Sequence, residues 1–176
     1  MTWVIAATSP FGHGAMISDV KVTLQSGATH DLIQKAFRVG NYIVAGFAGS
    51  VLNGYRLLDS ITLSLRLPPE LASTHAWEPV QIAKSWAPIA KTVFEEAPLS
   101  EQNLGSQFLV LGVSPTQNAG APEFARVYMV RFSAPDFTPD SCTGATKFAA
   151  SGLAPVLIDT SKRFVRILIL ELSIPK

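Results

Sequence analysis

Three residues near the start of the chain have side chains that could together activate a nucleophile. Thr2 directly follows Met1, and Asp19 and Lys35 come soon after it. A hydroxyl beside a chain terminus, a carboxylate and an amine are the parts of a nucleophile that is activated by its own α-amino group. No other stretch of the sequence offers a comparable set of side chains.

The composition predicts one domain with large contacts to other protein. The 176 residues suit a single core, and we expect one domain over 1–176. Charged residues make up 15% of the chain, against about a quarter in an ordinary soluble domain. The longest apolar tract, 164–175, is shorter than a membrane span and contains Arg166 and Glu171. We therefore expect no membrane association and favour extensive subunit interfaces as the cause of the low charge.

Several other classes are disfavoured by composition. The net charge is +1 and no basic run exceeds Lys162-Arg163, so we do not expect a nucleic-acid partner. Cys142 is the only cysteine, which excludes an intrachain disulfide and a multi-cysteine metal site. The three histidines lack the spacing of a metal site. No secretory signal is visible at the start, which predicts a cytoplasmic protein.

The segments around these residues read mainly as strands. Residues 2–7 and 15–18 predict a hairpin from the start of the chain, and 20–24 alternates like a half-exposed strand. Residues 25–31 read as a loop. The strands 36–39 and 42–47 follow, joined by a tight turn at Gly40-Asn41.

Helices are predicted in the middle of the chain, followed by strands and another helix. An amphipathic helix is expected over 51–65 and a second from Pro79, with Pro88 expected to kink it. The first would bury Val51, Tyr55, Leu58, Ile61 and Leu65, and the second Ile82, Trp86, Ile89 and Val93. Strands are predicted at 106–113, 124–132 and 147–151, then a helix at 153–164, while 165–174 fits strand or helix.

Four segments, in order, carry a family resemblance. They are Met1-Thr2 before an apolar strand, ISDVKVTL over 17–24, QKAFR over 34–38 and IVAGFAG over 43–49. With these segments the chain resembles the proteasome β-type subunits of the N-terminal nucleophile hydrolases, especially the small bacterial HslV-like peptidases and stand-alone proteasome homologues. The resemblance covers about the first 100 residues. It implies an α+β fold, the four-layer αββα sandwich of two antiparallel sheets flanked by helices, with which the predicted element order is compatible.

The resemblance also implies a role for each candidate residue. Thr2 would become the nucleophile once Met1 is removed, and its freed α-amino group or Lys35 would accept the hydroxyl proton. An unperturbed α-amine has a pKa near 8 and a lysine one near 10.4, so the α-amine is better matched to neutral pH. Asp19 would hold Lys35, whose charge favours the alkoxide on Thr2. The amide of Gly49 would donate to the oxyanion.

Two further positions are matched by the resemblance. Thr23 would belong to the strand that pairs with an extended peptide substrate, and Ser151 would bond near the terminal amine. Without the family, Gly49 also suits a strand-to-helix break and Ser151 a turn or helix entry. The family's supporting aspartate and serine have no evident counterpart before Lys176, so a neighbouring subunit would supply them or the supporting shell would be incomplete.

We therefore expect a cytoplasmic threonine endopeptidase that acts inside a homo-oligomeric ring on unfolded proteins or peptides. The chemistry requires no cofactor, and a partner ATPase is compatible with it although no residue identifies one. Two alternatives remain open at this point. One is a non-catalytic structural subunit with the same fold, and the other is an amidase of the same superfamily that acts on a small molecule.

Overall fold

The computed structural model describes residues 3–8, 14–23, 27–31, 33–40, 43–65, 79–114, 126–142, 148–151 and 170–172. The strands are β1 (Val4–Thr8), β2 (Gly14–Ser18), β3 (Lys21–Thr23), β4 (Thr29–Asp31), β5 (Ala36–Gly40), β6 (Ile43–Gly49), β7 (Ser106–Ser114), β8 (Arg126–Ser133), β9 (Asp140–Cys142), β10 (Phe148–Ser151) and β11 (Leu170–Leu172). The helices are α1 (Val51–Ser64), α2 (Pro79–Glu95) and α3 (Leu99–Gln102). The helix predicted over 153–164 lies outside the described residues.

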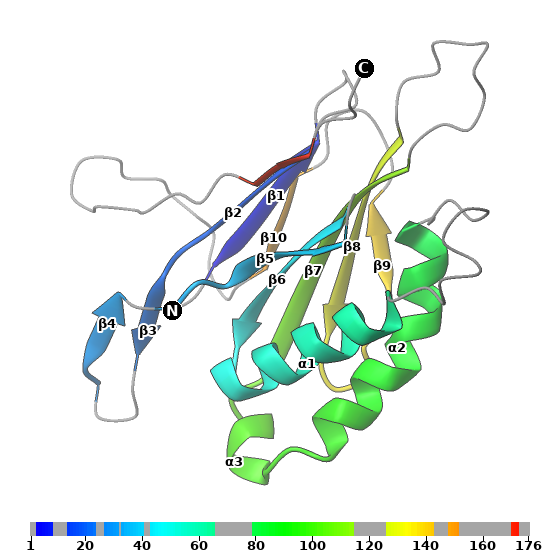
Figure 1. Ribbon diagram of the computed structural model, residues 1–176. Helices are drawn as coiled ribbons and strands as arrows, with labels where there is room; N and C mark the ends of the chain where they lie inside the picture. Colours follow the sequence, from blue (N-terminus) through cyan, green and yellow to red (C-terminus); the bar gives the residue numbers. More distant parts are fainter. Residues whose placement is uncertain are drawn as a thin grey trace, which may run out of the picture.

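The strands form antiparallel sheets, as predicted. One sheet has the order β10-β1-β2-β11 and a larger one the order β5-β6-β7-β8-β9. The strands β3 and β4 form a small third sheet that stands to one side of the others (Figure 1). The described part is therefore α+β, with antiparallel sheets and a few helices.

Strand β6 lies at the centre of the layers and is buried on both faces. All its residues are buried except Gly49, which explains why 43–48 is continuously apolar. One face of β6 packs against the four-stranded sheet in a cluster that includes Val4, Met16 and Val44. The opposite face packs against α1 and α2, which cover the outer side of the five-stranded sheet (Figure 1). The described layers are thus helices, sheet and sheet.

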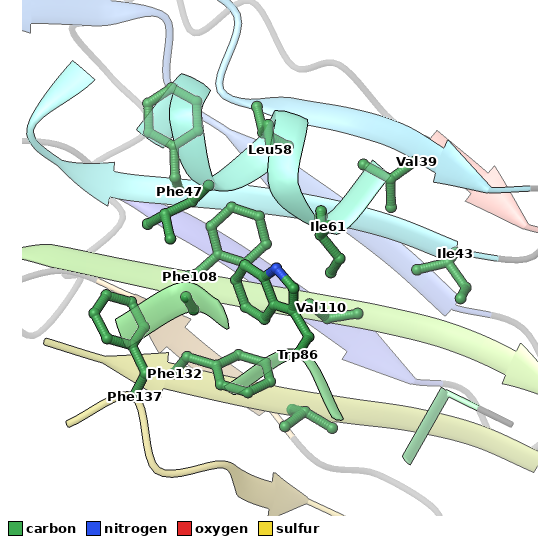
Figure 2. Close-up of a cluster of buried hydrophobic side chains, with 14 of the residues drawn as sticks. Val39, Ile43, Phe47, Leu58, Ile61, Trp86, Phe108, Val110, Phe132 and Phe137 are labelled. Carbon is green, nitrogen blue, oxygen red and sulfur yellow. The ribbon is translucent and has the colours of Figure 1, made fainter. Parts of the chain in front are cut away.

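An aromatic cluster fills the space between the helices and the five-stranded sheet (Figure 2). Trp86 of α2 is fully buried, and its ring centroid lies 4.9 Å from those of both Phe108 and Phe132. The indole N–H donates to Ser60 Oγ at 2.9 Å, so its one polar group has a partner inside the core. Trp86 therefore ties α2 to both α1 and the sheet.

The structure corrects several details of the predicted elements. Tyr55 and Ile89, predicted on buried helix faces, are 39% and 44% exposed, and Ala90 and Phe94 are buried instead on α2. The predicted loop over 25–31 contains β4, which pairs with β3. Neither β9 nor the short α3 was predicted. Among the described residues, no helix has the length and apolarity that crossing a membrane requires.

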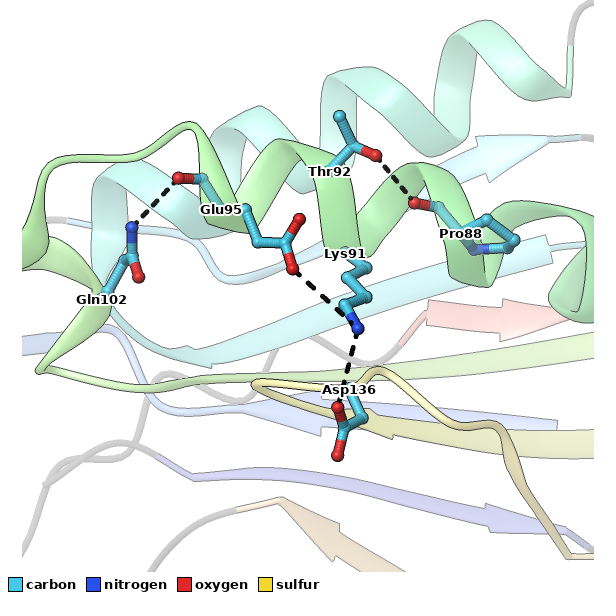
Figure 3. A network of polar contacts seen from close by, with 6 residues as sticks. All are labelled: Pro88, Lys91, Thr92, Glu95, Gln102 and Asp136. Carbon is cyan, nitrogen blue, oxygen red and sulfur yellow. Dashed lines mark hydrogen bonds and ion pairs between the residues drawn. The ribbon is translucent and has the colours of Figure 1, made fainter.

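Polar contacts join α2 to α3 and to the segment after β8, and the helix continues on both sides of Pro88 (Figure 3). Lys91 Nζ lies 3.9 Å from Glu95 Oε1 and 3.8 Å from Asp136 Oδ1. Gln102 Nε2 donates to the Glu95 carbonyl at 3.1 Å. Such exposed pairs stabilise by only about 0–1 kcal/mol each. The buried aromatic cluster, and not these ion pairs, therefore holds α2 in place.

The close approach of the two large sheets at Gly46 gives a stability prediction. A Cβ at Gly46 would lie 2.8 Å from Val4 Cγ1, 3.1 Å from Met16 Sδ and 3.2 Å from the Lys35 carbonyl oxygen. Gly46→Ala should therefore lower the free energy of unfolding by about 1–3 kcal/mol in urea denaturation. Gly40→Ala is the matched control, because its Cβ would meet only ordinary contacts at 3.7 and 3.8 Å. Equal stability of the two variants would contradict the sheet packing described here.

Candidate catalytic site

Asp19 and Lys35 come together from segments that border the two large sheets. Asp19 follows β2 and Lys35 immediately precedes β5. Lys35 Nζ donates to Asp19 Oδ1 at 2.9 Å. The lysine side chain is 1% exposed and the aspartate side chain 11%. The structure thus forms a buried ion pair from two of the residues that the sequence singled out.

Backbone hydrogen bonds fix both members of this pair. The Phe47 N–H donates to the Lys35 carbonyl at 3.1 Å, which ties the lysine backbone to β6. The Ile33 N–H donates to the Val20 carbonyl at 3.2 Å, which joins the segments on which the two charges lie. A buried ammonium is tolerated only with a partner in good geometry, and these bonds hold that geometry.

Burial raises the pKa of the Asp19 carboxyl above its ordinary value of 3.8. The hydrogen bond and the positive charge of Lys35 act in the opposite direction, as does a hydrogen bond with the backbone of Trp3, without cancelling the effect of burial. The positive charge of Lys35 therefore favours the ionised form of the Asp19 carboxyl. Loss of Lys35 would raise the pKa of Asp19 further.

The start of the described chain lies beside Asp19. The Asp19 N–H donates to the Trp3 carbonyl at 3.2 Å. The next residue, Val4 of β1, pairs with Ser18 of β2 on one side and with Ser151 of β10 on the other. Thr2 lies outside the described residues, but its chain neighbour Trp3 is bonded to the residue that holds Lys35. The backbone of Ser151 is placed one strand away from this point.

Gly49 ends β6 in a conformation that requires glycine. Its φ is +99°, and a Cβ would lie 2.3 Å from the Gly105 carbonyl oxygen. The N–H groups of a strand point alternately to its two edges. The Gly49 N–H should therefore point to the same edge as the Phe47 N–H, which bonds to the Lys35 carbonyl. The next N–H, of Ser50, bonds to Gly105 on the opposite edge at 3.0 Å. An amide donor is thus directed to the Lys35 side of the sheet.

Thr23 is placed by its backbone in the small sheet, opposite Thr29. Among the described strands β3 pairs only with β4. The structure therefore puts Thr23 on the strand that follows Asp19 along the chain.

The sequence analysis missed Ser50, which follows Gly49, and its hydrogen-bond partner Glu101. Ser50 caps α1, since its Oγ accepts the Asn53 N–H at 3.1 Å, and it also donates to Glu101 Oε2 at 2.5 Å. A serine before an amphipathic helix is a helix-start signal that could have identified the cap. Glu101 is 51 positions further along the chain, and no local pattern connects it to Ser50.

No protein-family model and no curated protein matches this chain. Within the described ranges, no group of three or more histidine, cysteine, aspartate or glutamate side chains could hold a metal ion. The chemistry of the site is therefore inferred from its geometry. A buried amine fixed by a carboxylate, with an amide N–H on the same side, can stabilise negative charge on an oxygen brought between them.

The ion pair predicts strong coupling between its two members. Asp19→Asn leaves the Lys35 charge buried without its counter-charge and should lower the free energy of unfolding by about 3–5 kcal/mol. Lys35→Met should cost less, because the Asp19 carboxyl can take up a proton. In a double-mutant cycle measured by urea denaturation, the double variant should be more stable than the sum predicts by at least about 1 kcal/mol. Additive effects would show that the two side chains do not interact.

The raised pKa of Asp19 predicts how the cost of Lys35→Met depends on pH. A carboxyl whose pKa is higher in the folded chain contributes stability that is fully present below its unfolded pKa and is lost as pH rises through the folded pKa. Because Lys35→Met should raise the folded pKa further, its stability deficit relative to the unaltered chain should grow as the pH rises from about 4 towards neutrality. A deficit that shrinks or stays constant over this range would contradict the assignment.

Proposed function

We propose that the chain is a threonine peptidase of the N-terminal nucleophile class, with the proteasome β-type fold. The observation that carries this proposal is the buried pair of Lys35 and Asp19 at 2.9 Å, whose carboxylate residue is bonded to Trp3. A nucleophile at position 2 would be only one residue from this contact. The full αββα sandwich belongs to the proposal: the described residues supply one helical layer and two sheets, and the helix predicted over 153–164 would belong to the second helical layer.

The proposed reaction begins when Met1 has been removed. The Thr2 hydroxyl attacks the carbonyl carbon of a peptide bond, and its proton passes to the freed α-amino group. The positive charge of Lys35, held by Asp19, favours the alkoxide, and the Gly49 N–H donates to the oxyanion that forms. The leaving amine takes a proton as the C–N bond breaks. Water then hydrolyses the ester on Thr2 and returns the enzyme to its starting state.

Two features support action on extended chains inside an assembly. The short β3 begins two residues after Asp19 and ends at Thr23, which suits a strand that pairs with an extended peptide beside the site. The low share of charged residues suits a chain with large contacts to copies of itself. We propose a homo-oligomeric ring in the cytoplasm that admits unfolded proteins or peptides, with an ATPase as an optional partner. Neither a cofactor nor a metal takes part in these steps.

Covalent labelling tests this function directly. Incubation with a peptide epoxyketone, which needs both a hydroxyl and a free α-amine, should give an intact mass lower by one methionine and higher by one inhibitor. Peptide mapping should place the adduct on Thr2. Thr2→Ala should show no adduct and should lower hydrolysis of an unfolded protein by at least about 10³-fold, whereas Thr2→Ser should retain labelling.

The remaining outcomes of this experiment discriminate between the alternatives. Retained Met1 with no adduct would refute the peptidase and favour a non-catalytic structural subunit. Turnover of small amides without cleavage of an unfolded protein would identify an amidase of the same superfamily. In both cases the fold-level observations would stand, but the proposed reaction would not.

A further inference from the structure

The loop that contains α3 contacts the beginning of α1 through three hydrogen bonds. Glu101 Oε2 accepts from Ser50 Oγ at 2.5 Å, and the Glu101 carbonyl accepts from Asn53 Nδ2 at 3.3 Å. The Gly105 carbonyl accepts from the Ser50 N–H at 3.0 Å. Ser50 is 1% exposed and Asn53 is fully buried. Both the side chain and the backbone of this loop therefore hold the residues that directly follow Gly49.

Glu101 supplies a charge that α1 lacks. The first turn of α1 contains no acidic residue, although a helix N-terminus favours negative charge. The Ser50 Oγ already accepts the Asn53 N–H, so its own proton is directed to the Glu101 carboxylate. The helix cap is thus completed by a residue from a different element. Removal of Glu101 would leave the buried Ser50 hydroxyl without its acceptor.

The same loop determines the position of the Gly49 peptide. Gly105 lies so close that no side chain fits at Gly49, and it bonds to the next amide, of Ser50. The bond from the Ser50 N–H to the Gly105 carbonyl therefore fixes the backbone on the C-terminal side of the Gly49 peptide. Small displacements of an oxyanion donor cost rate, because such donors act only when they are pre-aligned.

We propose that Glu101 is a positioning residue that aligns the Gly49 amide through Ser50, an inference that rests on the proposed function. Glu101 does not touch the reacting atoms. Its effect is on kcat, because the oxyanion forms only in the transition state, and not on the binding of the peptide. The α3 loop would then help to position the oxyanion donor, although Glu101 lies 51 residues along the chain from Ser50.

Three variants test this role. Glu101→Ala should lower kcat by about 10- to 100-fold with KM changed less than about twofold. Glu101→Gln retains an acceptor for Ser50 and should recover most of that loss. Glu96→Ala is the matched control, because Glu96 also pairs with α1, but through Arg56 at 3.5 Å, whereas the Ser50 hydroxyl donates to Glu101. It should leave kcat unchanged. Urea denaturation of all variants checks that each is folded during the assay.

A second readout does not depend on activity. Amide hydrogen exchange, followed by mass spectrometry on a peptide spanning 48–53, should be faster in Glu101→Ala than in Glu96→Ala or the unaltered chain. Faster exchange supports the positioning of this corner even when the unaltered chain hydrolyses no peptide, an outcome that refutes only the proposed function. Unchanged exchange overturns the role of Glu101. In an active enzyme, equal kcat for Glu101→Ala and Glu96→Ala also overturns it.

Discussion

The buried ion pair between Lys35 and Asp19 imposes the main constraint on this fold. An ammonium that is 1% exposed needs a carboxylate in good geometry, and the two charges come from segments bordering different sheets. Asp19 and Lys35 can meet only when the two sheets are stacked closely and in a single relative position. Gly46 makes this approach possible, because its missing side chain leaves room for Val4 and Met16 of the other sheet. Packing and charge thus depend on the same contact.

The pair is difficult to explain by stability alone. Replacement of a buried ion pair by well-packed apolar side chains is often neutral or stabilising, so an apolar pair would serve the core at least as well. Lys35 also lies on the edge of β6 to which the Gly49 N–H points, next to the bond between Asp19 and Trp3. The Lys35 ammonium and the Gly49 N–H could together stabilise negative charge on an oxygen. The loop that contains α3 bonds to Ser50, the residue after Gly49, and so contacts the same region.

Much of the fold could be predicted from the sequence where a strong periodic pattern was present. The strands near 43–49 and 106–114 and the helix near 51–64 have such patterns, and they were placed within a few residues. Patterns were less informative about burial. Tyr55 fits the apolar spacing of α1 but lies at its edge, where its ring contacts Phe37 and Phe47 while its hydroxyl reaches the Gln34 carbonyl.

Short polar elements and long-range contacts left no readable signal. Strands β4 and β9 are each three residues long and contain no apolar alternation, so only their pairing partners define them. Asp19 and Lys35 were selected through a family resemblance, since nothing in their spacing of 16 residues requires contact. No motif marks Glu101, and the serine that its side chain contacts lies 51 positions earlier in the chain. Its contact with Ser50 exists only once α3 has been folded against α1.

In the proposed reaction the hydroxyl of residue 2 meets the amine of residue 35. A crystal structure of the chain isolated from cells would measure this distance directly. We expect Met1 to be absent and Thr2 Oγ to lie within hydrogen-bond reach of Lys35 Nζ, at about 2.6–3.2 Å. A retained Met1, or a Thr2 hydroxyl directed away from the ion pair, would rule out the proposed reaction.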